Sequence, residues 1–319
     1  MHRILIIGKN SYIGKNLKNF LELSSAASRQ KGKELSSAAE KQECKNYLDQ
    51  KPGVQKTNKK EEFGVEANKA AGQTEVKRLD SEKRPLWMVD SVSGQNGEWQ
   101  DMDFSGYDVV VVCSALVHKN EKKLGWPAYL QANAILPLQI AEKAKAAGVK
   151  HYIFLSSLAV YGRGQERITA GQRPSPETYY GHSKYLAEQS LLPMADDAFT
   201  VTIVRPPMVY GERAKGSYRQ LQRLAAVLPL FPRIENQKSV ISLQNLCRFL
   251  RAVIVSRPGG IFHPQDSVYR STTELMQMAA GIRKIWLIPF PPALNRWLAA
   301  KSKLWCRAFG NLTVERQGL

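Results

Sequence analysis

The 319-residue sequence is poor in cysteine. Its four cysteines, Cys44, Cys113, Cys247 and Cys306, show no Cys-x-x-Cys or Cys/His spacing, which excludes a zinc ribbon and a disulfide framework. We therefore expect no metal site. The sequence also lacks a run of about 18 apolar residues, so no membrane-spanning helix is expected. A strand-like run begins at His2, which leaves no space for a signal peptide, and we expect a cytoplasmic protein.

Acidic residues are scarce as well. The 28 Asp and Glu residues stand against 46 Lys and Arg residues, giving a formal net charge of +18. From Glu212 onward there are 17 basic and 5 acidic residues, so this part carries +12 of the +18. No nucleic-acid-binding motif accompanies the charge, and we expect no nucleic-acid partner. A basic cleft would instead attract a small anionic ligand.

Residues 24 to about 85 contain almost no apolar clusters and are rich in Lys, Glu, Ser, Ala, Gln and Asn. A segment of this composition does not bury enough apolar surface to offset the entropy lost on ordering. We expect a disordered or partly helical insertion between the first helix and the second strand.

The remaining sequence opens with an apolar run, residues 2–7, followed by a glycine-containing turn and a segment with helical spacing. Unpaired N–H groups and the helix dipole make such a turn an anion site. The order strand, turn and helix is typical of a dinucleotide-binding βαβ unit, although Ser11 replaces the middle glycine of the pattern. It predicts NAD or NADP, with contacts from Gly8, Asn10, Ser11, Tyr12, Ile13 and Gly14.

The second strand is expected within residues 86–93, and it ends at Ser93-Gly94 without a clear acidic residue. Asp90 would contact the ribose only if this strand ended early, so the choice between NAD and NADP stays open. Asp103 and Phe104 are expected near the adenine. The largely apolar run 107–115 predicts a buried parallel strand, and its C-terminal end, Ser114 and Ala115, should lie beside the cofactor.

Tyr180 and Lys184 are spaced i and i+4, so in a helix their side chains share one face. A nearby cation lowers the pKa of a phenol, which makes it able to take and return a proton. Ser157 follows a strand-like run at residues 150–156 and could hold a sugar oxygen. A glycine turn, a Tyr/Lys pair and a serine at a strand end each also occur for purely structural reasons, and their combination is the informative feature.

Together these segments resemble the extended short-chain dehydrogenase/reductase family, which contains nucleotide-sugar epimerases, dehydratases and reductases. The resemblance rests on residues 8–14, 107–115, 154–162, 180–184, 205–211 and 239–246, and on Asn133. It implies an α/β fold with a Rossmann-type doubly wound parallel sheet at residues 1–206 and a smaller C-terminal α/β substrate domain at 207–319, partly interleaved.

The resemblance also implies roles for individual residues. Tyr180 would be the acid/base, Lys184 would lower its pKa and hold the nicotinamide ribose, and Ser157 would orient the substrate. Asn133 and Pro207 would join the cofactor site, and Lys215 and Lys238 the substrate site. Lys238 stands where the family usually has an arginine for the diphosphate, and lysine offers a point charge in place of a planar two-pronged donor.

The implied activity is a UDP-sugar 4-epimerase that works by transient hydride transfer, acting in surface polysaccharide biosynthesis. Leu158-Ala159 follow Ser157 where dehydratases carry an acidic pair, which argues against dehydration. Two alternatives stay open: a nucleotide-sugar 4-keto reductase or dehydrogenase, and a non-catalytic NAD(P)-binding protein. A steroid-type dehydrogenase would need an apolar pocket, which the basic C-terminal half disfavours.

The segment 285–307 is apolar, aromatic and basic. Two placements are open for it: peripheral contact with an anionic membrane surface, or packing on the substrate domain or on a partner subunit, as in a homodimer.

Overall fold

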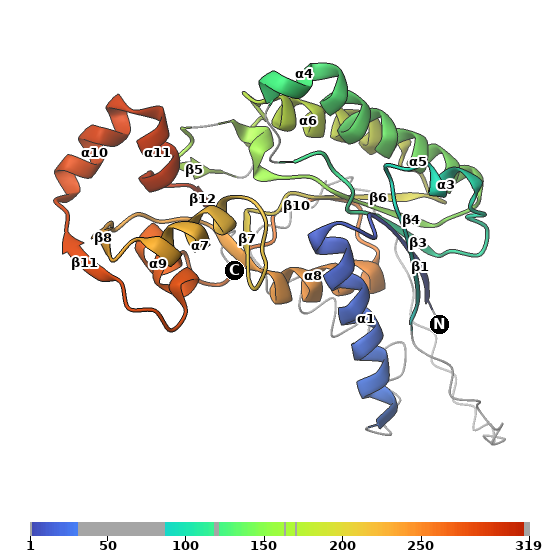
Figure 1. Ribbon diagram of the computed structural model, residues 1–319. Helices are drawn as coiled ribbons and strands as arrows, with labels where there is room; N and C mark the ends of the chain where they lie inside the picture. Colours follow the sequence, from blue (N-terminus) through green and yellow to red (C-terminus); the bar gives the residue numbers. More distant parts are fainter. Residues whose placement is uncertain (1, 31–86, 118–120, 163, 170, 316–319) are drawn as a thin grey trace, which may run out of the picture.

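The computed structural model describes residues 2–30, 87–117, 121–162, 164–169 and 171–315, so most of the expected insertion lies outside the described residues. The centre of the molecule is a six-stranded parallel sheet (Figure 1). In spatial order its strands are β10 (Gly260–Phe262), β6 (Thr200–Val204), β4 (His151–Leu155), β3 (Val109–Val112), β1 (His2–Ile7) and β2 (Trp87–Val92). This confirms the predicted doubly wound parallel sheet.

Helices cover both faces of this sheet, which is why its central strands are apolar throughout. The four valines of β3 have no exposed surface and alternate between two core clusters. Val109 and Val111 pack with α1 (Tyr12–Gln30) and α8 (Leu243–Ser256), whereas Val110 and Val112 pack with α5 (Leu136–Ala146) and α6 (Tyr179–Leu191). Figure 1 shows the two helical layers on opposite sides of the strands.

Short elements complete the sheet domain. They are α3 (Glu98–Asp101), α4 (Glu121–Leu130), the π-helical turn η1 (Gln131–Ile135) and the 3₁₀ turns η2 (Leu158–Tyr161) and η3 (Leu192–Met194).

The first helix extends further than the sequence indicated. The insertion was expected to begin at residue 24, but α1 continues to Gln30. Ser and Ala have fair to high helix propensity, and the Ser24 hydroxyl donates to the Phe20 carbonyl oxygen at 2.7 Å within the helix. Residues 24–30, the start of the expected insertion, are therefore helical. The second strand, β2, lies within the range predicted for it.

The order of the strands places the site. From β1 the chain passes outward to β2 and then returns to the other side of β1 as β3. Ligands of open parallel sheets bind outside the carboxyl ends of the strands at such a reversal. The turn after β1 and residues 114–115 after β3 meet at this point.

The C-terminal unit carries the remaining elements. They are β5 (Arg167–Ile168), β7 (Met208–Tyr210), α7 (Ser217–Val227), β8 (Leu230–Arg233), β9 (Val240–Ser242), α9 (Thr272–Ala280), β11 (Trp286–Pro289), α10 (Pro292–Lys301), α11 (Lys303–Phe309) and β12 (Thr313–Val314). Three two-stranded parallel sheets, β7/β9, β8/β11 and β5/β12, join them. Because β10 belongs to the large sheet and α8 packs against it, we propose that the domain division near residue 206 is discontinuous.

Part of the 285–307 segment packs on this unit. The Trp305 ring lies 4.4 Å from the Phe309 ring and 5.5 Å from Phe290, and Phe309 contacts Phe231 of β8 at 5.9 Å. None of the described helices has both the length and the apolar character that crossing a membrane requires.

Candidate active site

The turn after β1 has no room for side chains at two glycines. A Cβ on Gly8, whose φ is +124°, would lie 2.9 Å from the Ser114 backbone nitrogen. A Cβ on Gly14 would lie 2.5 Å from the Gly8 carbonyl oxygen. Ser11, which replaces a glycine, accepts a hydrogen bond from the Gly14 N–H at 2.8 Å and so caps the start of α1. The substitution leaves the tight turn and the helix N-terminus intact.

This turn is suited to a dinucleotide diphosphate, because backbone N–H groups and a helix N-terminus converge there without side chains in the way. The Tyr12 phenol donates to the Glu212 carbonyl oxygen at 2.8 Å and ties the same turn to the C-terminal unit. Asn10 and Ile13 belong to the same turn and first helical turn. Ser114 and Ala115 lie beside it at the end of β3, and a Cβ on Gly94 would come within 2.9 Å of the Ser114 hydroxyl oxygen.

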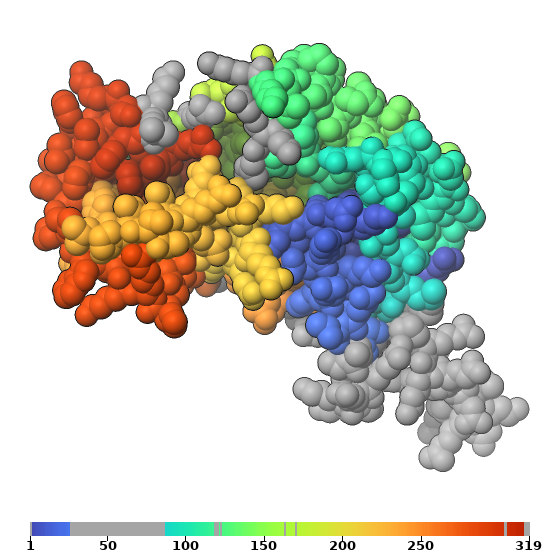
Figure 2. Space-filling view, in the orientation of Figure 1, coloured from blue at the N-terminus to red at the C-terminus, as the bar shows by residue number. Residues whose placement is uncertain are grey.

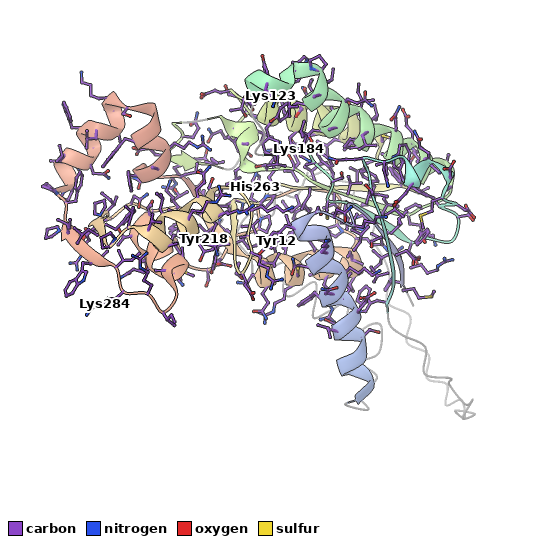
Figure 3. The ribbon with its side chains drawn as sticks, viewed as in Figure 1. Tyr12, Lys123, Lys184, Tyr218, His263 and Lys284 are labelled. Atoms are coloured by element: carbon purple, nitrogen blue, oxygen red, sulfur yellow. The ribbon has the colours of Figure 1, made fainter. Side chains whose placement is uncertain are left out.

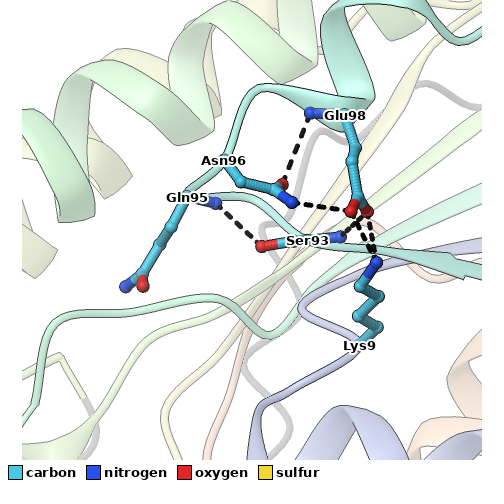
Figure 4. A network of polar contacts seen from close by, with 5 residues as sticks. All are labelled: Lys9, Ser93, Gln95, Asn96 and Glu98. Carbon is cyan, nitrogen blue, oxygen red and sulfur yellow. Dashed lines mark hydrogen bonds and ion pairs between the residues drawn. The ribbon is translucent and has the colours of Figure 1, made fainter.

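The corner where a cofactor ribose is expected holds an ion pair that the sequence did not indicate (Figure 4). The Lys9 ammonium donates to the Glu98 carboxylate at 2.5 and 2.6 Å. The Asn96 amide and the Ser93 backbone N–H donate to the same carboxylate at 2.6 and 3.2 Å. The hydrogen bond from Lys9, helped by those from Asn96 and Ser93, lowers the pKa of Glu98 to about 2.

The other residues expected near the adenosine, Asp90, Asp103 and Phe104, lie between the start of β2 and the start of β3. Asp90 lies inside β2 and accepts a hydrogen bond from the Tyr107 phenol at 2.7 Å, so the early strand end required for its ribose contact does not occur. The Asp103 carboxylate accepts two hydrogen bonds from Ser105, at 2.6 and 2.8 Å. The Phe104 side chain is buried in the core.

Tyr180 and Ser157 are brought together by a close contact between two backbone segments. Ser157 caps η2, its hydroxyl oxygen accepting the Ala159 N–H at 3.2 Å. Thr178 caps α6 by accepting the Gly181 N–H at 3.0 Å. A Cβ on Gly181 would lie 2.5 Å from the Ala159 carbonyl oxygen, so only glycine lets α6 approach η2 this closely. This approach brings the Ser157 hydroxyl close enough to the Tyr180 phenol to lower the pKa of that phenol.

The sequence led us to expect that Lys184 lowers the pKa of Tyr180, but in the structure burial dominates the pKa of both groups. Burial raises the pKa of Tyr180 to about 12, and the Ser157 hydrogen bond opposes this shift only in part. Lys184 is 1% exposed, and burial lowers its pKa to about 7. Its ammonium donates to the Leu155 carbonyl oxygen at 2.7 Å and lies 4.2 Å from the centre of the Phe154 ring. Lys184 lies near the middle of the molecule (Figure 3).

Asn133 is buried in the π-helical turn η1 and connects two parts of the site. Its amide exchanges hydrogen bonds with the Leu116 backbone at 2.7 and 3.0 Å and donates to the Ser183 hydroxyl at 3.0 Å. Ser183 in turn donates to the Tyr180 carbonyl oxygen at 3.0 Å. Asn133 therefore holds the segment after β3 against α6. Glu121, a residue that the sequence did not single out, accepts the Tyr180 N–H at 3.2 Å.

A buried polar network lies directly behind Ser157. The Arg205 guanidinium donates to the Glu188 carboxylate at 2.5 to 3.1 Å, and Ser156 donates to the same carboxylate. Arg205 also donates to the Tyr161 phenol oxygen at 2.6 Å, which is hydrogen-bonded to His263 at 2.7 Å. Because Glu188 is one turn beyond Lys184, the network joins α6 to the ends of β4 and β6.

The predicted substrate residues lie on the C-terminal unit. The Lys238 ammonium donates to the Arg307 carbonyl oxygen at 3.2 Å, and burial lowers its pKa to about 8. Lys215 is exposed, in the loop between β7 and α7. Pro207 is buried between β6 and β7. The structure thus brings Ser157 and Tyr180 into contact, with Lys184 on the same helix, whereas Lys215 and Lys238 stand on separate segments.

Comparison with known proteins identifies the family of the chain. The sequence profile of the NAD dependent epimerase/dehydratase family matches residues 4–246. The chain belongs to this family. The assignment confirms the predicted family, and the nicotinamide cofactor that was predicted agrees with it.

Two curated relatives are similar in sequence. A UDP-glucose 4-epimerase from Vibrio cholerae is 31% identical over 219 residues, which cover 64% of this chain and 63% of the relative. An N-acetyl-α-D-glucosaminyl-diphospho-ditrans,octacis-undecaprenol 4-epimerase from Escherichia coli O157:H7 is 28% identical over 216 residues, 66% of this chain and 64% of the relative. The matched part is thus just under two-thirds of the length of either relative.

Solved structures share the fold at low identity. A dTDP-4-dehydrorhamnose reductase from Bacillus anthracis, in complex with NADP, has a TM-score of 0.61 at 14% identity, covering 99% of this chain and 91% of that one. A UDP-glucuronic acid 4-epimerase from Bacillus cereus, in complex with NAD, has a TM-score of 0.59 at 15% identity, covering 90% and 86%.

Proposed function

We propose that the protein is a nucleotide-sugar 4-epimerase that uses NAD or NADP and Tyr180 as its acid/base, acting in surface polysaccharide biosynthesis. The observation that carries the proposal is the Ser157–Tyr180 hydroxyl contact at the end of β4, with Lys184 buried one turn further along α6. Both curated relatives are named as 4-epimerases of sugars that carry a diphosphate. That shared chemistry supports reaction at carbon 4.

Each proposed site residue has a separate role in cofactor binding, substrate positioning or proton transfer. The turn from Gly8 to Gly14 holds the cofactor diphosphate, and Lys184 holds the nicotinamide ribose. A bound nicotinamide supplies hydride acceptance and return. Ser157 positions the sugar hydroxyl by hydrogen bonding, and Tyr180 takes the hydroxyl proton as the sugar becomes a ketone and returns it when the hydroxyl forms again.

The charge of the substrate suits the C-terminal unit. A nucleotide sugar brings at least two negative charges on its diphosphate, and the segment from Glu212 onward carries +12. Lys215, exposed on the loop after β7, and Lys238 are the proposed diphosphate ligands. Lys238 would exchange its hydrogen bond to the Arg307 carbonyl for a phosphate oxygen, which would also restore its full charge.

A second candidate is a 4-keto-sugar reductase, in which hydride moves once. Lys9 favours this reading, because a cation at the ribose corner suits the 2′-phosphate that distinguishes NADP, the usual cofactor of net reductions. In the structure the Glu98 carboxylate already binds the Lys9 ammonium. The 2′-phosphate of NADP would have to displace this carboxylate to reach Lys9, whereas NAD has no 2′-phosphate to bind there.

The deciding experiment incubates the purified full-length chain with UDP-glucose and UDP-N-acetylglucosamine and follows the 4-epimers by chromatography, with and without added NADH or NADPH. Epimer formation without reduced cofactor is expected, and Tyr180→Phe should lower its rate by about 10² to 10⁴. Tyr179→Phe is the matched control, because Tyr179 is the neighbouring tyrosine and is 41% exposed.

Each other outcome has a meaning. Net consumption of NADPH with a 4-keto sugar and no epimer would replace the epimerase with the reductase. Equal activity in Tyr180→Phe and the wild type would refute the assigned acid/base. Tight cofactor binding without turnover of any substrate would make the chain a non-catalytic NAD(P)-binding protein.

A further inference from the structure

The end of the C-terminal unit carries an apolar sheet face. In the β8/β11 sheet, Trp286 pairs with Leu230 and Ile288 pairs with Pro232. Alternate residues of a strand face opposite sides. Phe231 of β8 is 5% exposed and packs inward, whereas Leu230, Trp286 and Ile288 are 51%, 62% and 48% exposed. Both faces of this small sheet are therefore apolar, and the outer one is open to solvent.

More exposed apolar side chains follow at the same end of the molecule. We define the C-terminal apolar surface by seven residues that are each more than 40% exposed: Val227, Leu230, Ile282, Trp286, Ile288, Leu294 and Trp297. They lie at the end of α7, on β8 and β11, before β11 and on α10. Figures 1 and 2 show these elements together at one end of the molecule.

The C-terminal segment that contributes most of this surface has charged residues of only one sign. Residues 275–314 contain six Lys and Arg residues and no Asp or Glu. Lys284, Arg296 and Lys301 are exposed, and the Lys284 ammonium lies 4.6 Å from the centre of the Trp286 ring. The Arg283 guanidinium has a structural use, donating to the Ala225 carbonyl oxygen at 2.7 Å. The apolar surface is therefore bordered by cations without acidic partners from its own segment.

This combination fits an anionic lipid bilayer. Apolar and aromatic side chains enter the headgroup region, and flanking Lys and Arg bind anionic headgroups at its edge. A second copy of the chain fits less well, because a symmetric contact would bring the cations of one copy close to the same cations of the other, and these would repel. We propose that the C-terminal apolar surface docks the protein peripherally on an anionic membrane, with Trp286 and Ile288 inserted and Lys284, Arg296 and Lys301 at the headgroups.

Docking at this surface leaves the candidate active site free. Lys284 lies at the far end of the C-terminal unit from Lys184 (Figure 3). Turnover of a soluble nucleotide sugar and binding to vesicles are therefore separate measurements. The membrane inference goes beyond the proposed function and stands or falls independently of it.

The test is cosedimentation of the full-length chain with vesicles of phosphatidylcholine alone and of phosphatidylcholine with phosphatidylglycerol. We expect binding to the anionic vesicles that weakens as salt is added. The double variants Trp286→Ser/Ile288→Ser and Lys284→Glu/Arg296→Glu should each lower the partition coefficient about tenfold or more, since each removes one of the two contributions. Both pairs are exposed, so melting temperatures should stay near that of the wild type.

Two matched controls test the location. Leu23→Ser removes an apolar side chain that is 69% exposed on α1, and Lys150→Glu reverses an exposed cation before β4. Neither should change vesicle binding. Equal loss in the controls, or equal binding to neutral vesicles, would overturn the proposal. So would absence of vesicle binding together with dissociation of a dimer in Trp286→Ser/Ile288→Ser, measured by light scattering, because the surface would then be a subunit interface.

Discussion

The buried ion pair between Arg205 and Glu188, next to the proposed site residue Ser157, should make a large contribution to folding stability. This contribution appears only when one partner of the pair is removed. The side chains of Arg205 and Glu188 are 4% and 1% exposed, and the guanidinium binds both carboxylate oxygens. Arg205→Met removes the cation but keeps most of the volume, leaving the Glu188 carboxylate buried. Breaking a buried pair in this way costs about 3–5 kcal/mol, a large part of the 5–15 kcal/mol that holds a typical domain folded.

A second variant removes both charges of the pair. In Arg205→Met/Glu188→Leu no unpaired ion remains, and replacing such a pair with apolar residues of similar volume is often neutral. The Ser156 hydroxyl loses its carboxylate partner, which costs about 1–3 kcal/mol, whereas the Tyr161 phenol loses Arg205 but keeps its hydrogen bond to His263. The double variant should therefore be more stable than Arg205→Met alone, although it carries one more substitution.

Urea unfolding followed by tryptophan fluorescence measures both variants, and an unchanged m-value shows that the change lies in stability. A double variant less stable than Arg205→Met would refute the ion-pair reasoning, as would a loss below about 1 kcal/mol in Arg205→Met. Activity gives a second test. Ser156 is adjacent to Ser157, so the double variant should lose kcat/KM for epimerisation even where it is fully folded.

Two further predictions concern charged groups at the site. Burial lowers the pKa of Lys184 from 10.5 to about 7, so between these values only the unfolded chain binds the proton and unfolding free energy rises with pH. Lys184→Met should therefore raise the free energy of unfolding in urea, by about 1 kcal/mol or more near pH 6 and by less near pH 10. Equal gains at both pH values would contradict this reasoning. The same variant should abolish epimerisation, because it removes the proposed ribose ligand. Glu98→Gln frees Lys9 and should shift cofactor preference several-fold toward NADPH in fluorescence titrations. Asp197→Asn, which alters an exposed carboxylate outside this corner, should leave the preference unchanged.

The sheet was predictable because its sequence signal is local. β1, β3 and β4 are short apolar runs, as strands covered on both faces must be, and β2 fell inside its expected range although it follows the insertion. The tight turn after β1 was likewise visible in its glycines. The end of the first helix was not, because Ser and Ala suit both a helix and a polar linker, and packing against the sheet decides between them.

The missed parts of the site depend on contacts that sequence spacing does not encode. Lys9 occupies a variable position of the cofactor turn, and its partner Glu98 lies 89 positions away in the sequence, outside that motif. Glu121 reaches the Tyr180 N–H from 59 positions away, at the start of a helix with no distinguishing pattern. The network from Ser156 to His263 joins three strand ends, so its members become neighbours only once the sheet has formed.

The pKa values of Tyr180 and Lys184 bear on the proposed role of Tyr180 as the acid/base. At neutral pH a phenol with a pKa of about 12 is protonated, and a lysine with a pKa of about 7 is only partly charged. A positive charge within about 4–6 Å lowers a phenol pKa by about 1–3 units. In the structure the Lys184 ammonium is held instead by the Leu155 carbonyl oxygen. A ligand that released Lys184 from this bond and brought its own positive charge would lower the phenol pKa, so under the proposed function we expect proton transfer only when the site is filled.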